Sequence, residues 1–201
     1  NPTIQNLIQE LVAFPFFIGS LFKYRKFIQH TIHLFLRNTR FSLRTINNLR
    51  SLERKLGMYE IMSRYSNDRI ILVDEGPILA AHMFVFTEAS YAPEEIARFT
   101  TLLPLPDLII YVRASVDTLV RRTLQRVDAP REINKQDLAQ TKKYANSAVR
   151  LFDQLVKAEN TRCRLLVVES LDFAEQGYSK VVEDISQMIL NHLAPTLGKE
   201  K

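Results

Sequence analysis

The sequence is poor in glycine and cysteine and contains no tryptophan. It has five glycines in 201 residues, whereas average usage of about 7% would give roughly fourteen. A loop that wraps phosphate with bare backbone therefore has little material in this chain. The single cysteine, Cys163, cannot form an internal disulfide, and no second cysteine or histidine stands near it at zinc-ligand spacing. This pattern predicts a reducing, cytoplasmic setting.

The sequence also lacks a long hydrophobic run. The longest uncharged apolar stretch, Leu11–Phe22, has twelve residues and is interrupted by Pro15 and Gly19. It is too short to span a bilayer, and it follows Glu10 instead of the basic residues that open a signal peptide. Hydrophobic residues make up 46% of the chain and charged residues 24%, which excludes a disordered or collagen-like protein and predicts a globular one.

Basic residues are concentrated in the first third of the chain. Residues 1–60 contain nine Lys and Arg against three acidic residues, and the whole chain has a formal net charge of +5. Eight aromatic residues lie between positions 14 and 41. The combination fits a helical segment with a buried aromatic face and a solvated basic face, and it also fits a surface for an acidic protein or an anionic membrane. No nucleic-acid recognition motif is visible, so nucleic acid is not expected as a partner.

Three short apolar runs predict buried strands of a parallel sheet, because they are rich in Ile, Val and Leu and hardly alternate with polar residues. They are Ile70–Val73, Leu108–Val112 and Leu165–Val168. The segments between and around the strands follow helical periodicity; the expected helices are Leu43–Tyr65, Pro93–Leu102, Ser115–Gln125, Gln136–Glu159 and Phe173–Leu193. Pro93, followed by two glutamates, suits a first helical turn, and Ser115 is an expected N-cap. The alternation predicts an α/β core over residues 43–201, joined in one domain by a helical, basic and aromatic region over residues 1–42.

Residues that follow the predicted strands are the candidates for chemistry, because ligands of open parallel sheets bind beyond the carboxyl ends of the strands. Asp74 could hold magnesium through water or accept a proton from an attacking hydroxyl, or it could cap the helix that Pro77 opens. Arg122 and Arg126 lie four residues apart after the second strand, and Arg131 follows in a loop. These arginines could clamp phosphoryl oxygens, or they could form a solvated helix face.

Three segments together resemble a known family. The run from Asp68 to Gly76, the run from Leu105 to Arg113 with its proline-aspartate step, and the run from Leu119 to Arg126 look like the second half of a P-loop nucleoside or nucleotide kinase of the thymidylate-kinase-like group. The resemblance covers about residues 45–190 in the order of elements. It implies a three-layer parallel sheet with helices on both faces, ATP and Mg²⁺ as cofactors, and phosphoryl transfer to a nucleoside, nucleotide or other small acceptor.

The resemblance also implies roles for single residues. Asp74 would be the catalytic or magnesium-linked carboxylate, Arg122 would lie against the nucleotide base or phosphates, and two lid arginines would close on the phosphates, Arg126 and Arg131. Ser170, after the last strand, would lie near the adenine. The first helical region falls where members of the family carry acceptor-binding helices, so the candidates for holding an anionic acceptor are Arg37, Arg40 and Arg44.

The chain departs from the family in ways that leave the acceptor open. Arg113 stands where this group often has an acid, and Glu75 stands where an arginine is usual. The phosphate-binding motif G-x-x-x-x-G-K-[ST] is missing, because none of the five glycines begins it. In the family the strand before that loop is central, between the strand with the acid and the strand with the proline-aspartate step. We therefore expect this strand and loop upstream of Asn1.

Two functions follow from these observations. The first is an ATP-dependent phosphotransferase of the P-loop kinase kind, acting on a small acceptor. The second is a non-catalytic α/β interaction module that docks through residues 11–44 on an acidic protein or an anionic membrane surface.

Overall fold

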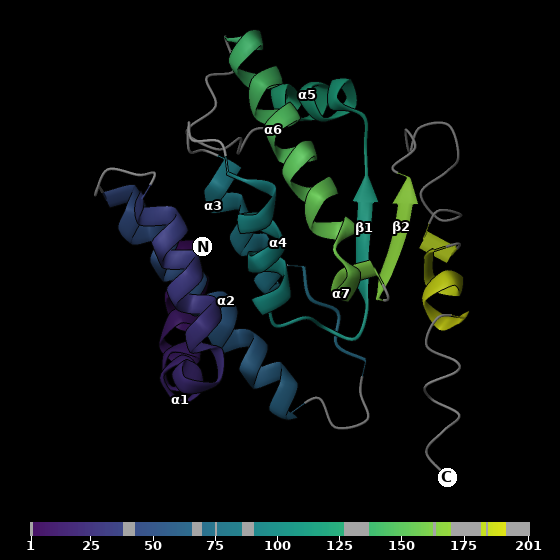
Figure 1. Cartoon of the computed structure of the whole chain (residues 1–201). Coiled ribbons are helices and arrows are strands. Elements are labelled where there is room, and N and C mark those ends of the chain that lie inside the picture. The colour runs from purple at the N-terminus through teal and green to yellow at the C-terminus, as the bar shows by residue number, and fades with distance from the viewer. Residues whose placement is uncertain are drawn as a thin grey trace. The chain divides into compact units, whose positions relative to one another are not determined.

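The computed structural model describes residues 2–37, 43–65, 70–74, 76–85, 91–126, 137–162, 164–169, 182–183 and 185–191, with residues 2–6 and 43–44 described by their backbone alone. These residues are mostly helical, with a small parallel sheet of two strands and a long N-terminal helix (Figure 1). The fold is therefore α/β with few strands. The chain divides into two compact units, Asn1–Leu105 with Asn146–Thr161, and Pro106–Ala145 with Arg162–Lys201.

The first unit is built from helices. Its elements are α1 (Pro2–Arg37), α2 (Leu43–Tyr65), the 3₁₀ turn η1 (Pro77–Ala81), α3 (His82–Val85), α4 (Pro93–Leu102), the second part of α6 (Leu138–Lys157) and most of α7 (Glu159–Arg162). Its core is aromatic, because the fully buried Phe99 ring lies 5.2 Å from that of Phe27 and 5.3 Å from that of Phe84 between centroids. The helices predicted over Leu43–Tyr65 and Pro93–Leu102 are confirmed to the residue.

The second unit contains the sheet. Its elements are β1 (Ile109–Arg113), α5 (Val116–Gln125), the first part of α6 and β2 (Leu165–Glu169). The strands are parallel, and their register runs from Ile109 opposite Leu165 to Arg113 opposite Glu169. The two later strands predicted from the sequence are confirmed to within one residue. Of the last predicted helix, Phe173–Leu193, residues 182–183 and 185–191 are helical, and the rest lies outside the described residues.

The predicted strand Ile70–Val73 is wrong. These residues are described, yet they form no strand, and Ile70 and Leu72 are 61% and 79% exposed. An apolar run of this kind suits a strand buried on both faces, but a strand exists only where a neighbour supplies backbone hydrogen bonds. No described segment pairs with residues 70–73, so the run stays irregular. Asp74 consequently lies in an exposed bend instead of at the end of a strand.

Helix α1 doubles back along α2. Its second limb, residues 24–35, runs antiparallel to α2, since Tyr24 bonds to Glu60 and a short connection joins the helices. A straight α1 would carry its first limb, residues 7–16, past the end of α2 at Tyr65. Instead, Ala13 lies against Gly57, and Glu10 pairs with Arg50. The sequence supplies the means for a bend, because Pro15 removes a backbone donor and Gly19-Ser20 is a pair at which helices kink.

The first limb and α2 approach each other at a glycine. A Cβ atom on Gly57 would collide with the carbonyl oxygen of Ala13 and lie 2.8 Å from its Cβ. A Cβ on Gly19, the other helical glycine of this unit, would meet no atom within 4 Å. Gly57 therefore serves helix packing, while Gly19 has room for a side chain.

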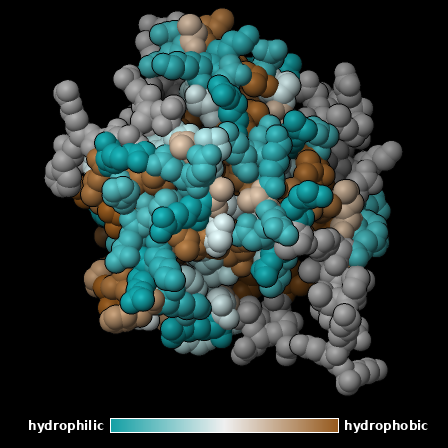
Figure 2. Space-filling view, viewed as in Figure 1, coloured by the Kyte–Doolittle hydropathy of each residue, from teal (hydrophilic) through white to brown (hydrophobic). Residues whose placement is uncertain are grey.

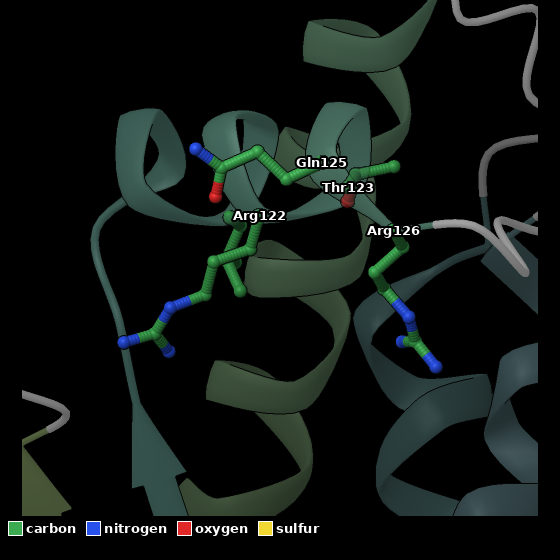
Figure 3. Close-up of a pocket in the computed structure, with 5 residues that line it drawn as sticks. Arg122, Thr123, Gln125 and Arg126 are labelled. Atoms are coloured by element: carbon green, nitrogen blue, oxygen red, sulfur yellow. The ribbon is translucent and has the colours of Figure 1, made fainter. Parts of the chain in front are cut away.

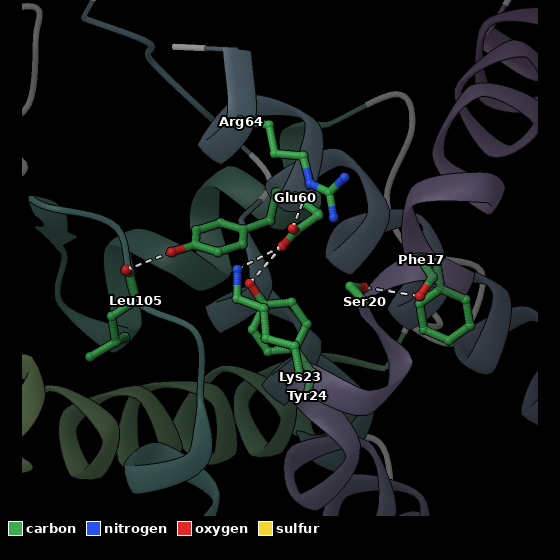
Figure 4. Close-up of polar contacts among 8 residues, drawn as sticks. Phe17, Ser20, Lys23, Tyr24, Glu60, Arg64 and Leu105 are labelled. Atoms are coloured by element: carbon green, nitrogen blue, oxygen red, sulfur yellow. Dashed lines mark hydrogen bonds and ion pairs between the residues drawn. The ribbon is translucent and has the colours of Figure 1, made fainter. Parts of the chain in front are cut away.

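A buried carboxylate joins the second limb to α2 (Figure 4). One Glu60 oxygen accepts hydrogen bonds from the Tyr24 hydroxyl at 2.9 Å and the Lys23 ammonium at 3.0 Å, and the other accepts one from Arg64 at 2.8 Å. Burial alone would raise the pKa of the Glu60 carboxyl, but the hydrogen bonds from Arg64, Lys23 and Tyr24 outweigh it and hold that pKa below its ordinary value. The carboxylate is therefore charged near neutral pH.

Substitution of Gly57 tests the close approach of the two helices. Gly57→Ala is expected to lower the free energy of unfolding by about 1–3 kcal/mol, because the methyl group must push α1 away. Gly19→Ala, the matched control, is expected to raise it by about 0.5–1 kcal/mol through helix propensity alone. Urea unfolding followed by circular dichroism measures both. A Gly57→Ala protein as stable as Gly19→Ala would contradict the packing described here.

Substitution of Glu60 tests the buried carboxylate. Because its pKa is below the ordinary 4.5 in the folded chain, its charge stabilises the fold above pH 4.5, and this contribution is lost as the pH falls through the lower folded-state value. Glu60→Gln should therefore cost about 1–3 kcal/mol near neutral pH, and the cost should shrink in acid. The exposed Glu94→Gln is the control, with urea unfolding at several pH values as the measurement. A cost that is the same in acid would contradict the assignment.

Candidate functional site

The candidate site of the second unit begins where β1 ends. After Arg113 the chain passes through Ala114 to Ser115, which is the N-cap of α5 as predicted. The Ser115 hydroxyl accepts a hydrogen bond from the backbone N–H of Thr118 at 3.2 Å and donates one to the Thr118 hydroxyl at 2.9 Å. The cap satisfies a backbone donor that would otherwise lack a partner. It thereby starts α5 directly at the carboxyl end of the strand, where ligands of parallel sheets bind.

The last turn of α5 brings two predicted arginines to one hollow. This hollow has a volume of about 440 Å³ and is lined by Leu119, Arg122, Thr123, Gln125 and Arg126. Arg126 is already past the helix, where its N–H bonds to the carbonyl of Arg122 at 3.0 Å. Figure 3 shows both guanidinium groups on the same side of the helix, but they diverge instead of meeting at a point. The two arginines line the same hollow, but their guanidinium groups do not converge as a clamp on an anion would.

The charged side chains of this hollow favour the binding of an anion. Guanidinium groups donate paired hydrogen bonds that match phosphate oxygens. The C-terminal end of a helix carries partial negative charge, which favours cations there. Arg122 and Arg126 are therefore well placed as charged groups, and the helix dipole itself contributes no attraction for an anion. The volume is within the range of small-molecule sites.

Other charges near α5 are paired across the surface. The Arg113 guanidinium lies 3.9 Å from the Glu169 carboxylate, with both side chains exposed. The Lys142 ammonium of α6 lies 3.6 Å from the Asp117 carboxylate in the first turn of α5. Exposed pairs of this length stabilise a fold little. Arg113, one of the departures from the resembled family, is thus matched by the acid opposite it in the β2 register.

Asp74 belongs to the first unit and is an exposed carboxylate. Within the described parts of the chain, no three His, Cys, Asp or Glu side chains gather to hold a metal ion. A single carboxylate suits Mg²⁺ only in the mode in which the ion keeps several waters and takes its other ligands from substrate phosphates. Asp74 fits that mode.

The structure describes some of the remaining predicted residues and not others. Arg37 forms a two-bond ion pair with Glu95, with nitrogen–oxygen distances of 2.6 and 3.0 Å. The hydrogen bond raises the pKa of Arg37 and lowers that of Glu95. The backbone of Arg44 lies in the first turn of α2, and its side chain is not described. Three further predicted residues lie outside the described residues: Arg40, Arg131 and Ser170.

The exposed side of α1 is a feature that the sequence interpretation missed. Phe27 and Phe35 are buried as an aromatic face requires, but Phe14 and Phe22 are exposed. The stretch Leu7–Arg37 is long and apolar enough, by length and composition only, to cross a membrane, and 17% of its most apolar part is buried. The uncharged run Leu11–Phe22 is too short by itself to span a bilayer, but the helix continues beyond it through charged residues. The lack of charge between Leu11 and Phe22 was the available signal.

Comparison with known proteins leaves the chain without a relative. No protein-family model matches it. Searches of curated proteins and of solved structures also give no significant match. The function must therefore be argued from the residues themselves.

Proposed function

We propose that this chain belongs to a P-loop kinase-like phosphotransferase, which uses ATP and Mg²⁺ to phosphorylate a small acceptor such as a nucleoside or nucleotide. The observation that carries the proposal is the passage from β1 through Ser115 into α5, whose end presents Arg122 and Arg126 to one hollow. A strand, a capped turn and an arginine-bearing helix follow each other in the order expected for the lid side of such kinases.

The state of the sheet supports the same proposal. β1 pairs with β2, and no other described segment pairs with β1. An unpaired edge of this kind on β1 is expected where a further strand of a three-layer parallel sheet would lie. Helices on both faces would complete the layers.

The residues of the chain have different roles in this proposal. Arg122 and Arg126, joined by Arg131, donate to the phosphoryl oxygens and stabilise the charge that develops during transfer. Asp74 accepts the proton of the acceptor hydroxyl or holds Mg²⁺ through water. Bound Mg²⁺ supplies neutralisation of phosphate charge. Ser170 lies against the adenine.

The structure leaves fewer candidate residues for binding the acceptor than the sequence implied. Arg37 is engaged by Glu95, so binding an anionic acceptor would require it to give up a charged hydrogen bond. Arg40 and Arg44 remain the candidates for that role. The position of Arg113, which pairs with Glu169 instead of offering an acid, leaves the class of acceptor open among small molecules.

Pyrophosphate binding tests the arginine hollow on the chain itself. We expect pyrophosphate to shift the backbone NMR resonances of the last turn of α5, because its oxygens match the guanidinium donors. Arg122→Ala and Arg126→Ala should each weaken binding about tenfold or more, as expected for loss of a charged hydrogen bond. Arg121→Ala is the matched control, since Arg121 is on the same helix and does not line the hollow. Equal losses in all three variants, or no shift at α5, would contradict the proposal.

Turnover tests Asp74, and it is measured on a protein that includes the phosphate loop. Asp74→Asn is expected to lower kcat by about 10²- to 10⁴-fold, the usual worth of a general base. Its thermal unfolding should be unchanged, because the side chain is exposed in a bend. Asp107→Asn, also exposed in a bend, is the control and should keep wild-type turnover. Unimpaired turnover in Asp74→Asn would remove Asp74 from this role.

A further inference from the structure

The outer face of α1 is apolar and exposed. Figure 2 shows hydrophobic residues among hydrophilic ones at the left edge of the molecule. Six apolar residues of α1 are each about half exposed or more: Leu7, Ile8, Leu11, Phe14, Ile18 and Phe22. Within the first limb, Leu7, Leu11 and Phe14 are spaced four and three residues apart and so lie on one side of the helix. Soluble proteins rarely leave so large an apolar surface uncovered, so this face marks an interaction site.

Positive charge follows the apolar residues of α1 along the chain. Arg25 and Lys26 follow Phe22 at three and four residues and are exposed. Neither makes a hydrogen bond or ion pair within the part of the chain that the structure describes. The acidic residue of α1, Glu10, does not offset this positive charge, because its side chain is largely buried and paired with Arg50. The face thus presents apolar side chains bordered by uncompensated positive charge.

We infer that this face of α1 docks on an anionic lipid bilayer, with its apolar side chains at the acyl boundary and Arg25 and Lys26 at the level of the headgroups. Apolar side chains bordered by basic ones are the pattern of helices that lie in a membrane interface. Long basic side chains can keep their charge among phosphates while their stems cover apolar surface. The attraction of each basic residue to an anionic leaflet adds to apolar burial.

The geometry of α1 favours docking over spanning. The limb from Leu7 to Ile18 is about 18 Å long at 1.5 Å per residue, whereas the hydrocarbon core is about 30 Å thick. The helix then turns back, and its inner face carries the Tyr24, Lys23 and Glu60 bonds that hold it to α2. A straight span would have to break these bonds and put the Lys23 ammonium in lipid. Docking leaves the first unit intact.

Flotation with vesicles tests the inference on the full chain. The protein should float with phosphatidylcholine vesicles that contain about 30% phosphatidylserine and should float less as salt rises from about 0.05 M to 0.5 M. Arg25→Glu with Lys26→Glu should lower partitioning on anionic vesicles about 25-fold or more, with little effect on neutral ones. Leu11→Ser with Phe22→Ser should lower it about tenfold or more on both.

Matched controls carry the same changes elsewhere. Arg98→Glu with Lys143→Glu makes an equal change in net charge at exposed positions of α4 and α6. Leu72→Ser with Leu138→Ser removes two exposed apolar side chains outside α1. Both double variants should float like the wild type. Because all substituted positions are exposed, the circular dichroism spectra should match in every variant.

Several results would overturn the inference. These are no flotation with anionic vesicles at low salt, or flotation that the α1 variants reduce no more than the controls do. Resistance to alkaline carbonate extraction would show a spanning helix. A dimer in sedimentation equilibrium that Leu11→Ser with Phe22→Ser breaks, without vesicle binding, would assign the face to a second copy. Binding to soluble polyglutamate without flotation would assign it to an acidic protein. None of these results bears on the phosphotransferase proposal, which rests on α5.

Discussion

The buried Glu60 carboxylate is the interaction on which the first unit depends. A charged group removed from water is costly unless hydrogen bonds replace its hydration, and Glu60 receives them from Lys23, Tyr24 and Arg64. Two of these donors belong to α1, at or next to the start of its second limb, and one belongs to α2. Sliding α1 along α2 would therefore leave a buried charge without its partners. The carboxylate in this way sets the register of the longest helical contact in the chain.

Other features of the first unit follow from that register. With the second limb fixed against α2, the bend between the two limbs returns the first limb along α2, where Ala13 meets Gly57. The side of each limb that faces α2 takes part in this packing. The outer side of the first limb has no helix left to cover it in the described chain, and it is the side rich in Leu, Ile and Phe. The packing that stabilises α1 thus also creates its exposed apolar face.

Local signals in the sequence were enough for part of this fold. Ser115 as an N-cap and Pro93 at a first turn predicted the starts of α5 and α4, and the dense Ile, Val and Leu of β1 and β2 predicted strands. Ile70–Val73 has the same composition and is not a strand, because pairing is a non-local property that composition cannot report. The Glu60 bonds were likewise invisible, since they depend on the packing of α1 against α2, which brings together positions 36 residues apart. Arg122 and Arg126 were placed at one hollow by spacing alone, but their divergence arises at the helix end.

The position of these arginines also says what the α5 hollow can do by itself. A phosphate loop binds anions with the positive end of a helix and with bare N–H groups, whereas Arg122 and Arg126 sit where the helix dipole opposes an anion. The charge of the arginine side chains must overcome that opposition. The hollow alone should therefore bind phosphate weakly, and added salt should weaken the binding further. In a phosphotransferase such a site is useful because it adds charge when a nucleotide is already held elsewhere. Under the proposed phosphotransferase function, the arginines at α5 supply charges that close on a nucleotide, while the five glycines of the chain leave little material for a phosphate loop.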